Sequence, residues 1–125
     1  MSPPGTVRVL VVDDQVEMAQ MVADHLCDRG YDGMALSSGT EALHVLATER
    51  IDVLVTDLRM PGLDGLSLLQ ASRALDPSRP VVLMTAFSAF DSALQATSLG
   101  AYHYLAKPFR LDKLISILEQ ALRRG

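Results

Sequence analysis

The sequence predicts an α/β protein in which a five-stranded parallel sheet is covered by helices on both faces. First, five short apolar segments alternate strictly with five segments of helical periodicity, the pattern of right-handed β-α-β crossovers. Second, the apolar segments are apolar at odd and even positions alike, as strands buried on both faces are. Third, the length of 125 residues suits one domain with a single core.

In the first half of the chain, the segment VRVLVV predicts a strand over 7–12. Apolar residues at three- and four-residue spacing then predict a helix over 15–29, which Gly30 ends. The apolar stripe of this helix consists of Ala19, Val22, Ala23 and Leu26. A weaker strand signal over 32–36 precedes a helix over 40–49. The stripe of that helix consists of Ala42, Leu43, Leu46 and Ala47.

In the second half, the segment IDVLVT predicts a strand over 51–56 that runs directly into Asp57. The segment MPGLDG follows, and its Pro and Gly residues indicate a loop. The remaining elements are expected to be a helix over 65–75, a strand over 80–85, a helix over 89–99, a strand over 102–106 and a helix over 111–123. The last helix has the clearest stripe, formed by Leu111, Leu114, Ile115, Leu118, Ala121 and Leu122.

Composition narrows the class of function. The net charge of −4 argues against direct binding to nucleic acid, because such binding depends on clustered Lys and Arg. No apolar run approaches the roughly 18 residues of a membrane span, and the N-terminal MSPPGT does not resemble a signal peptide. The expected location is therefore cytoplasmic, without a membrane partner. The single cysteine, Cys27, excludes an internal disulfide and is expected in the core.

Polar residues close the predicted strands at one edge of the sheet. Asp13 and Asp14 follow the first strand, Asp57 the third, Thr85 ends the fourth, and Lys107 follows the fifth. Because parallel strands share one polarity, their carboxyl ends meet at the same edge, and these side chains should converge there. In a sheet of order 2-1-3-4-5, ligands bind outside that edge, in the crevice between the first and third strands.

The convergence of three carboxylates predicts a bound cation. Each pair of negative charges repels by roughly 4 kcal/mol at 4 Å and an effective dielectric constant near 20. Oxygen ligands without His or Cys favour Mg²⁺. A metal ion, a hydroxyl, an ammonium group and a carboxylate together indicate a phosphoryl-transfer site. Asp57 is the best candidate for the nucleophile, because it stands alone on the central strand.

Each of these residues also has an ordinary structural interpretation. Asp14 could cap the following helix, Thr85 could be a strand-end hydroxyl, and Lys107 could be a solvated loop residue. Asp57 before a Pro-Gly loop is common turn chemistry. The coincidence of these residues at four strand ends is what favours a functional site.

Four segments resemble the receiver (REC) domain of two-component response regulators: VLVVDDQ, VLVTDLRMPGLDG, VVLMTAF and GAYHYLAKPF. The resemblance covers most of the chain and implies a receiver domain over 7–123 after an N-terminal extension over 1–6. It implies the flavodoxin-like (CheY-like) doubly wound fold, with a five-stranded parallel sheet of order 2-1-3-4-5 and five flanking helices. DLRMPGLDG and GAYHYLAKPF are most similar to receivers of NtrC/DctD-type sigma-54-dependent transcriptional activators, although His103 and Phe87 depart from that subfamily's common Asp and His.

The resemblance assigns a role to each residue of the metal site. Asp57 is implied to be the phosphoacceptor and a metal ligand. Asp14 is implied to bind Mg²⁺ directly and Asp13 mainly through water. The backbone carbonyl of Arg59 is implied to complete the protein ligands.

The resemblance also implies a switch. Thr85 and Lys107 are expected to bind the phosphoryl oxygens, and Tyr104 is expected to turn inward when Thr85 moves toward them. The peptide bond from Lys107 to Pro108 is implied to be cis. In this family the side chains two positions after the phosphoacceptor and two after the Thr tune the lifetime of the aspartyl phosphate, and here they are Arg59 and Phe87. Phe87, Phe90 and His103 are expected on the face presented to partners.

The function implied is a phosphorylation-activated signalling switch. Such a domain takes a phosphoryl group from a sensor histidine kinase with Mg²⁺ as cofactor, and catalyses only its own phosphorylation and dephosphorylation. Its implied partners are the kinase, a second copy in a homodimer, and an output domain that regulates transcription. An alternative is a stand-alone single-domain regulator that acts by protein contact.

Other classes fit the residues less well. A flavin-binding electron carrier shares the sheet order, but DDQVEM would place two anions where the flavin phosphate binds. A phosphatase of the haloacid dehalogenase type needs an acidic residue two positions after its nucleophile, where this chain has Arg59. A degenerate receiver that only binds partners is disfavoured because all five polar positions are filled.

Overall fold

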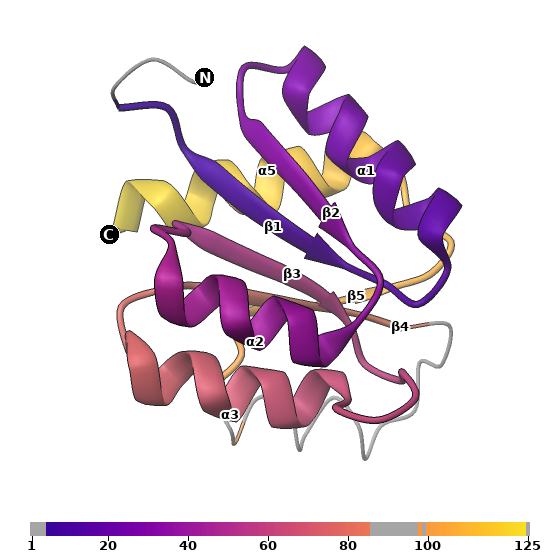
Figure 1. Cartoon of the computed structure of the whole chain (residues 1–125). Helices are drawn as coiled ribbons and strands as arrows, with labels where there is room; N and C mark the ends of the chain where they lie inside the picture. Colours follow the sequence, from indigo (N-terminus) through magenta and orange to yellow (C-terminus); the bar gives the residue numbers. More distant parts are fainter. Residues whose placement is uncertain (1–4, 86–97, 99, 125) are drawn as a thin grey trace.

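The computed structural model describes residues 5–85, 98 and 100–124 of the chain. Within them lie five strands and four helices (Figure 1). The strands are β1 (Arg8–Val12), β2 (Asp32–Leu36), β3 (Val53–Asp57), β4 (Val81–Thr85) and β5 (His103–Ala106). The helices are α1 (Val16–Asp28), α2 (Gly39–Thr48), α3 (Gly65–Leu75) and α5 (Leu111–Arg124). The helix expected over 89–99, with Phe87 and Phe90, lies outside the described residues apart from position 98.

The sheet is parallel throughout and has the strand order β2-β1-β3-β4-β5, which confirms the predicted topology. The main difference in strand limits concerns β3, which begins at Val53 and includes Asp57. Asp57 belongs to the strand because it is in register with Met84 of β4. The phosphoacceptor candidate is therefore held by the sheet itself, at the last position of a central strand.

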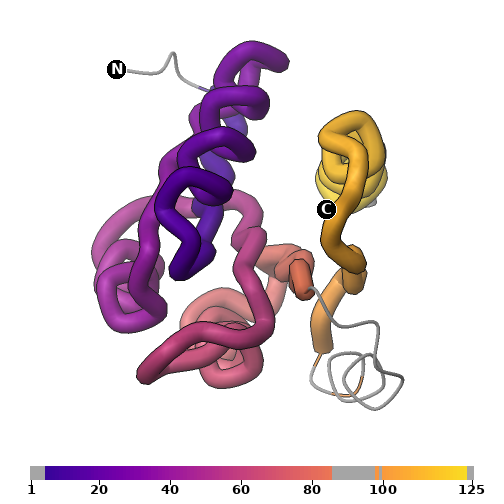
Figure 2. The backbone as a smooth tube through the Cα atoms, turned by 90° about the vertical axis from the view of Figure 1, so that its right-hand side faces the viewer, coloured from indigo at the N-terminus to yellow at the C-terminus, as the bar shows by residue number. Residues whose placement is uncertain are grey.

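Helices cover both faces of the sheet. α1 and α5 lie on one face, and α2 and α3 lie side by side on the other (Figures 1 and 2). Side chains of successive strand residues point to opposite faces, and in β1 this sends Val9 and Val11 to the core under α1 and α5, and Leu10 and Val12 to the core under α2 and α3. Both cores need apolar side chains, which explains why the strands are apolar at every position of their centres.

Local hydrogen bonds set where the helices begin. The side chains of Ser38 and Asp64 cap α2 and α3, accepting from the backbone N–H groups three residues later at 3.3 and 2.9 Å. The N-cap of α1 is Gln15, whose side chain makes no capping bond. Its backbone N–H donates instead to Asp13 Oδ1 at 2.9 Å. The interpretation of Asp14 as a helix cap is therefore wrong, and its carboxylate stays available for another role.

Cys27 is exposed, so the expectation that it lies in the core is wrong. Its Sγ lies 3.6 Å from the carbonyl oxygen of Gly33 in β2. β2 is an outer strand of the sheet, so no further strand of the described structure covers this contact. Among the described residues, no helix is both long and apolar enough to cross a membrane.

Candidate functional site

The structure brings the predicted polar residues together at the carboxyl edge of the sheet. Asp13 follows β1 and is still tied to β2, because its N–H donates to the Leu36 carbonyl at 3.1 Å. Asp57 and Thr85 are the last residues of β3 and β4. Lys107 follows β5, and its N–H donates to the Thr85 carbonyl at 2.6 Å. Backbone bonds between neighbouring strands thus fix the positions of four of the five residues.

The three carboxylates form one acidic cluster. One oxygen each of Asp13, Asp14 and Asp57 lies within 4.8 Å of the others. Asp13 is fully buried and Asp57 is 8% exposed, whereas Asp14 is exposed. The cluster therefore has two fixed, desolvated carboxylates on its inner side and one on the side that faces solvent.

Lys107 supplies the positive charge of the site. Its Nζ lies 2.5 Å from Asp13 Oδ2 and 3.6 Å from Asp57 Oδ1, and its side chain is only 14% exposed. Its main partner is thus Asp13, and the ammonium also lies within ion-pair distance of Asp57. The Lys107–Pro108 peptide bond is cis, as the resemblance implies.

The electrostatics of the cluster centre on Asp57. Burial raises the pKa of its carboxyl group, Lys107 acts in the opposite direction, and the charges of Asp13 and Asp14 raise it further. Keeping all three carboxylates ionised requires positive charge beyond that of one lysine. A hard divalent cation suits the site, because its ligands would all be oxygens. This is also the one group of three such ligand side chains within the described parts of the chain.

The alternation of side chains along the strands places Thr85 on the same face of the sheet as Tyr104. Thr85 and Leu83 share one face of β4, and Leu83 is in register with Tyr104 of β5. Leu83 and Tyr104 belong to the core under α2 and α3, and Thr85 is buried with 1% exposure. Thr85 and Tyr104 therefore lie on the same face of the sheet, within two residues of register, which is the arrangement that the predicted switch requires.

The loop after β3 carries Arg59, whose side chain is exposed. Its start is held by two backbone bonds: the N–H of Leu58 donates to the Met84 carbonyl at 2.7 Å, and the N–H of Gly65 donates to the Leu58 carbonyl at 2.9 Å. Phe87, the other predicted lifetime residue, lies outside the described residues.

Gly65 is a residue of the site that the sequence analysis did not single out. A Cβ there would lie 2.2 Å from the Asp57 carbonyl oxygen and 2.8 Å from Leu58 Cα. Only glycine allows α3 to begin so close to the end of β3. The available signal in the sequence was a glycine directly after the capping Asp64, eight positions after Asp57.

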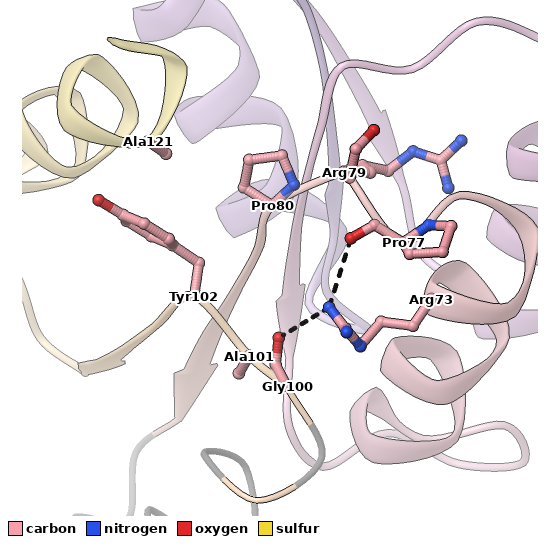
Figure 3. A pocket seen from close by; sticks show the side chains of 9 residues that line it. Arg73, Pro77, Arg79, Pro80, Gly100, Ala101, Tyr102 and Ala121 are labelled. Atoms are coloured by element: carbon pink, nitrogen blue, oxygen red, sulfur yellow. Dashed lines mark hydrogen bonds between the residues drawn. The ribbon is translucent and has the colours of Figure 1, made fainter. Parts of the chain in front are cut away.

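A cavity at the opposite edge of the sheet has different chemistry (Figure 3). It has a volume of about 410 Å³ and lies near the starts of β4 and β5, where Pro80 and Tyr102 line it. Arg73 donates there to the carbonyls of Pro77 and Gly100 at 3.4 and 3.5 Å. None of the predicted site residues lines this cavity, so the carboxyl edge remains the candidate site.

The chain is similar to known proteins over most of its length. A family model described as response regulator receiver domain matches residues 9–119. The chain is 40% identical over 114 residues to the DNA-binding transcriptional regulator NtrC of Escherichia coli K12, an alignment that covers 91% of this chain and 24% of that protein. The chain thus spans about a quarter of the length of this curated relative.

Solved structures show the same fold. The chemotaxis protein CheY4 of Vibrio cholerae superposes with a TM-score of 0.88 at 29% identity, over 94% of this chain and 99% of that one. The response regulator TrrA of Thermotoga maritima, solved in complex with Mg²⁺-BeF, gives a TM-score of 0.84 at 28% identity, over 93% and 99% of the two chains.

Proposed function

This chain belongs to the family of response regulator receiver domains, which are phosphorylation-activated switches, and we propose that Asp57 is its phosphoacceptor. The observation that carries the proposal is the position of Asp57. It ends a central strand, within 4.8 Å of the acidic pair that follows β1 and 3.6 Å from the Lys107 ammonium. A carboxylate next to a cation at the crevice of a doubly wound sheet is placed for nucleophilic attack on a bound phosphoryl group.

The reaction follows from these groups. A carboxylate oxygen of Asp57 attacks the phosphorus of a phosphohistidine in line, the new O–P bond forms as the N–P bond breaks, and the imidazole leaves with the electron pair. Attack requires the ionised carboxylate, and Lys107 opposes the effect of burial on its pKa. Lys107 and the Thr85 hydroxyl then bind the transferred phosphoryl oxygens.

We propose that Asp13, Asp14, Asp57 and the backbone carbonyl of Arg59 hold Mg²⁺. The support is the oxygen-only donor set and the mutual distances within 4.8 Å, together with the similar fold of TrrA, which was solved in complex with Mg²⁺-BeF. When bound, the ion neutralises negative charge on the phosphoryl oxygens. Asp13 and Asp57 orient it from the inner side of the site, and Asp14 supplies a charged ligand from the solvent side.

The partners belong to the proposal as well. The phosphodonor is a sensor histidine kinase, and the phosphorylated domain forms a homodimer or acts on an output domain. Because the NtrC relative is a DNA-binding transcriptional regulator, we propose transcription as the output, through a segment other than this acidic domain. We place the domain at 7–123, after an extension over 1–6, in a cytoplasmic protein whose only chemistry is its own phosphorylation and dephosphorylation.

Intact-mass spectrometry tests the phosphoacceptor. The protein is incubated with acetyl phosphate and Mg²⁺, and one phosphoryl group should be added. Asp57→Asn should fold and gain none, and EDTA should prevent the gain in the wild type. Asp64→Asn is the matched control, because Asn keeps the cap of α3 in the same loop. Phosphorylation of Asp57→Asn at the wild-type level would disprove the assignment.

A further inference from the structure

The loop between β3 and α3 also packs against the start of α2. Gly39, the first residue of α2, is buried. A Cβ at Gly39 would lie 2.1 Å from the carbonyl oxygen of Leu63 and 3.0 Å from its Cβ. The backbone of Gly39 is not in the left-handed region, so space alone, and not conformation, requires glycine at this position.

Gly65 and Gly39 pack against the two ends of the β3–α3 loop. Gly65 packs on the carbonyl of Asp57, where the loop leaves β3, and Gly39 packs on Leu63, near its other end. Between these contacts lies Arg59, whose carbonyl is a proposed metal ligand. α2 is fixed to the core by the buried side chains of Ala42 and Leu46, so it offers a rigid surface against which the loop rests.

From these contacts we infer that Gly39 is a positioning residue for the metal site, acting through Leu63 on the loop that carries Arg59. The inference rests on the proposed function and names a part of the chain outside the set of ligands. A methyl group at Gly39 requires a shift of roughly 1 Å, because real Cβ atoms keep about 3 Å from such an oxygen. The loop exposes Arg59, Pro61 and Gly62, whereas α2 is held by its helical hydrogen bonds and its buried side chains, so the shift falls on the loop. Displacements of about 1 Å away from the chemistry can lower activity by up to roughly 100-fold.

The chain contains a matched control for this contact. Gly33 in β2 also approaches a backbone carbonyl, that of Ala23 in α1, and a Cβ there would lie 2.5 Å from the oxygen. This contact lies between β2 and α1 and includes no residue of the β3–α3 loop. Gly33→Ala and Gly39→Ala should therefore both lower the free energy of unfolding, while only the second disturbs the loop.

The test compares wild type, Gly39→Ala and Gly33→Ala by Mg²⁺ titration calorimetry and by amide chemical shifts of residues 57–64. Gly39→Ala should weaken Mg²⁺ binding by about tenfold or more and shift the loop amides in metal-free buffer. Gly33→Ala should keep the Mg²⁺ affinity within about twofold and leave those amides in place. Equal effects of the two variants on the loop amides would overturn the inference.

A second pair of variants covers the case in which Gly39→Ala fails to fold. Leu63 and Leu43 are both half-buried and pack on the same core, but only Leu63 belongs to the loop. Leu63→Ala should weaken Mg²⁺ binding several-fold more than Leu43→Ala, and equal affinities would overturn the inference. The metal-free amide shifts do not depend on Mg²⁺ binding, so a wild type that binds no Mg²⁺ would disprove the proposed metal site while the loop contact is still measured.

Discussion

At the scale of single residues, the site is a set of charges that do not balance. Asp13 and Asp57 are buried and share the ammonium of Lys107, whereas Asp14 is exposed. Without a metal ion, three carboxylates face one lysine. The excess negative charge lowers the stability of the folded protein. Such a loss of stability is expected at a binding site, where the residues are suited to the ligand and not to the fold.

Asp57→Asn should stabilise the metal-free protein, because it removes a carboxylate whose pKa is raised first by burial and then by Asp13 and Asp14. A raised folded-state pKa means that the ionised form costs stability at neutral pH. The gain should be present above the raised pKa. It should disappear as the pH falls through that pKa toward 3.8, where the wild type is protonated too.

Urea unfolding between pH 4 and 8 in EDTA checks this prediction. The exposed carboxylate of Asp28 gives the control, since Asp28→Asn should change stability by less than about 0.5 kcal/mol. A variant of Asp57 that is less stable than wild type at pH 7 would show that the carboxylate is held by interactions stronger than its repulsion.

Asp14→Ala should bind Mg²⁺ at least about tenfold more weakly than wild type, because a charged ligand is lost while the buried core stays intact; this corresponds to about 1.4 kcal/mol. Calorimetric titration measures the affinity. Asp24→Ala removes another exposed carboxylate of the α1 region, one that accepts a hydrogen bond from Gln20, and should leave the affinity unchanged. Equal affinities for Asp14→Ala and wild type would exclude Asp14 as a ligand.

The lifetime of the aspartyl phosphate is also a property of single residues. We propose that Arg59 and Phe87 screen it, since a guanidinium forms charge-assisted hydrogen bonds to phosphoryl oxygens and a phenyl ring offers no acceptor to orient water. Replacing them with Asn and Glu should speed phosphate release by roughly tenfold. The release of phosphate from the purified phosphoprotein measures the rate, and an unchanged or slower rate would remove the screening role but leave Asp57 as acceptor.

At the scale of elements, Arg79 ties together three segments at the edge opposite the site. Its Nε donates to the Ile51 carbonyl before β3 at 2.9 Å, and its Nη1 donates to the Ser72 hydroxyl of α3 at 2.9 Å. Ser72 is fully buried and Arg79 is 7% exposed. Burial lowers the pKa of the guanidinium, and Asp76 and Asp52 oppose this. Removing the side chain would leave a buried carbonyl and a buried hydroxyl unpaired.

Arg79→Met should therefore lower the free energy of unfolding by about 3 kcal/mol, the range expected for lost hydrogen bonds to a charged group. Denaturant unfolding measures this loss. Arg110→Met is the control, because its side chain is 88% exposed. Below its unfolding transition, Arg79→Met should still accept a phosphoryl group at the wild-type rate, because Arg79 lies at the far edge of the sheet; a slower rate would show that the two edges are coupled.

At the scale of the whole molecule, the parallel sheet separates stabilising groups from reactive ones. The carboxyl ends of the strands carry the acidic cluster and Lys107, and the opposite edge carries Arg79 and the cavity of Figure 3. β5 lies at the edge of the sheet, with Tyr104 half-buried on the same face as Thr85. A movement of Thr85 therefore acts on the strand next to it, β5, which is an outer strand of the sheet.

Phosphorylation should move Thr85 and Tyr104 and change the surface formed by β5 and α5, where His103 is exposed. Carrying a population from 1:99 to 99:1 needs about 5.5 kcal/mol, and charge-assisted bonds to Thr85 and Lys107 supply roughly 1.5–3 kcal/mol each. Amide spectra before and after phosphorylation measure the change. Shifts are expected in β4, β5 and α5 and should be absent in Asp57→Asn, while an unmoved β5 would contradict the switch.

Much of this architecture was predictable because it depends on patterns within short segments. The alternation of strands and helices and the convergence of Asp13, Asp57 and Lys107 follow from periodicity and from the common polarity of parallel strands, and the strand order follows from the resemblance to receiver domains. Strand limits were not predictable in this way. β3 begins two residues later than predicted and includes Asp57, because pairing with β1 at Val53 and with β4 at Asp57, and not apolar character, defines the strand.

The sequence by itself determined the elements, their order and the edge at which the charged residues meet, because each of these depends on spacing along the chain. Only the tertiary structure decided that Lys107 lies closer to Asp13 than to Asp57, that Cys27 is exposed, and that α2 rests on the β3–α3 loop at Gly39. These facts depend on differences of about 1 Å between segments far apart in sequence. Such distances are set by how whole elements pack, and no local pattern of residues encodes them.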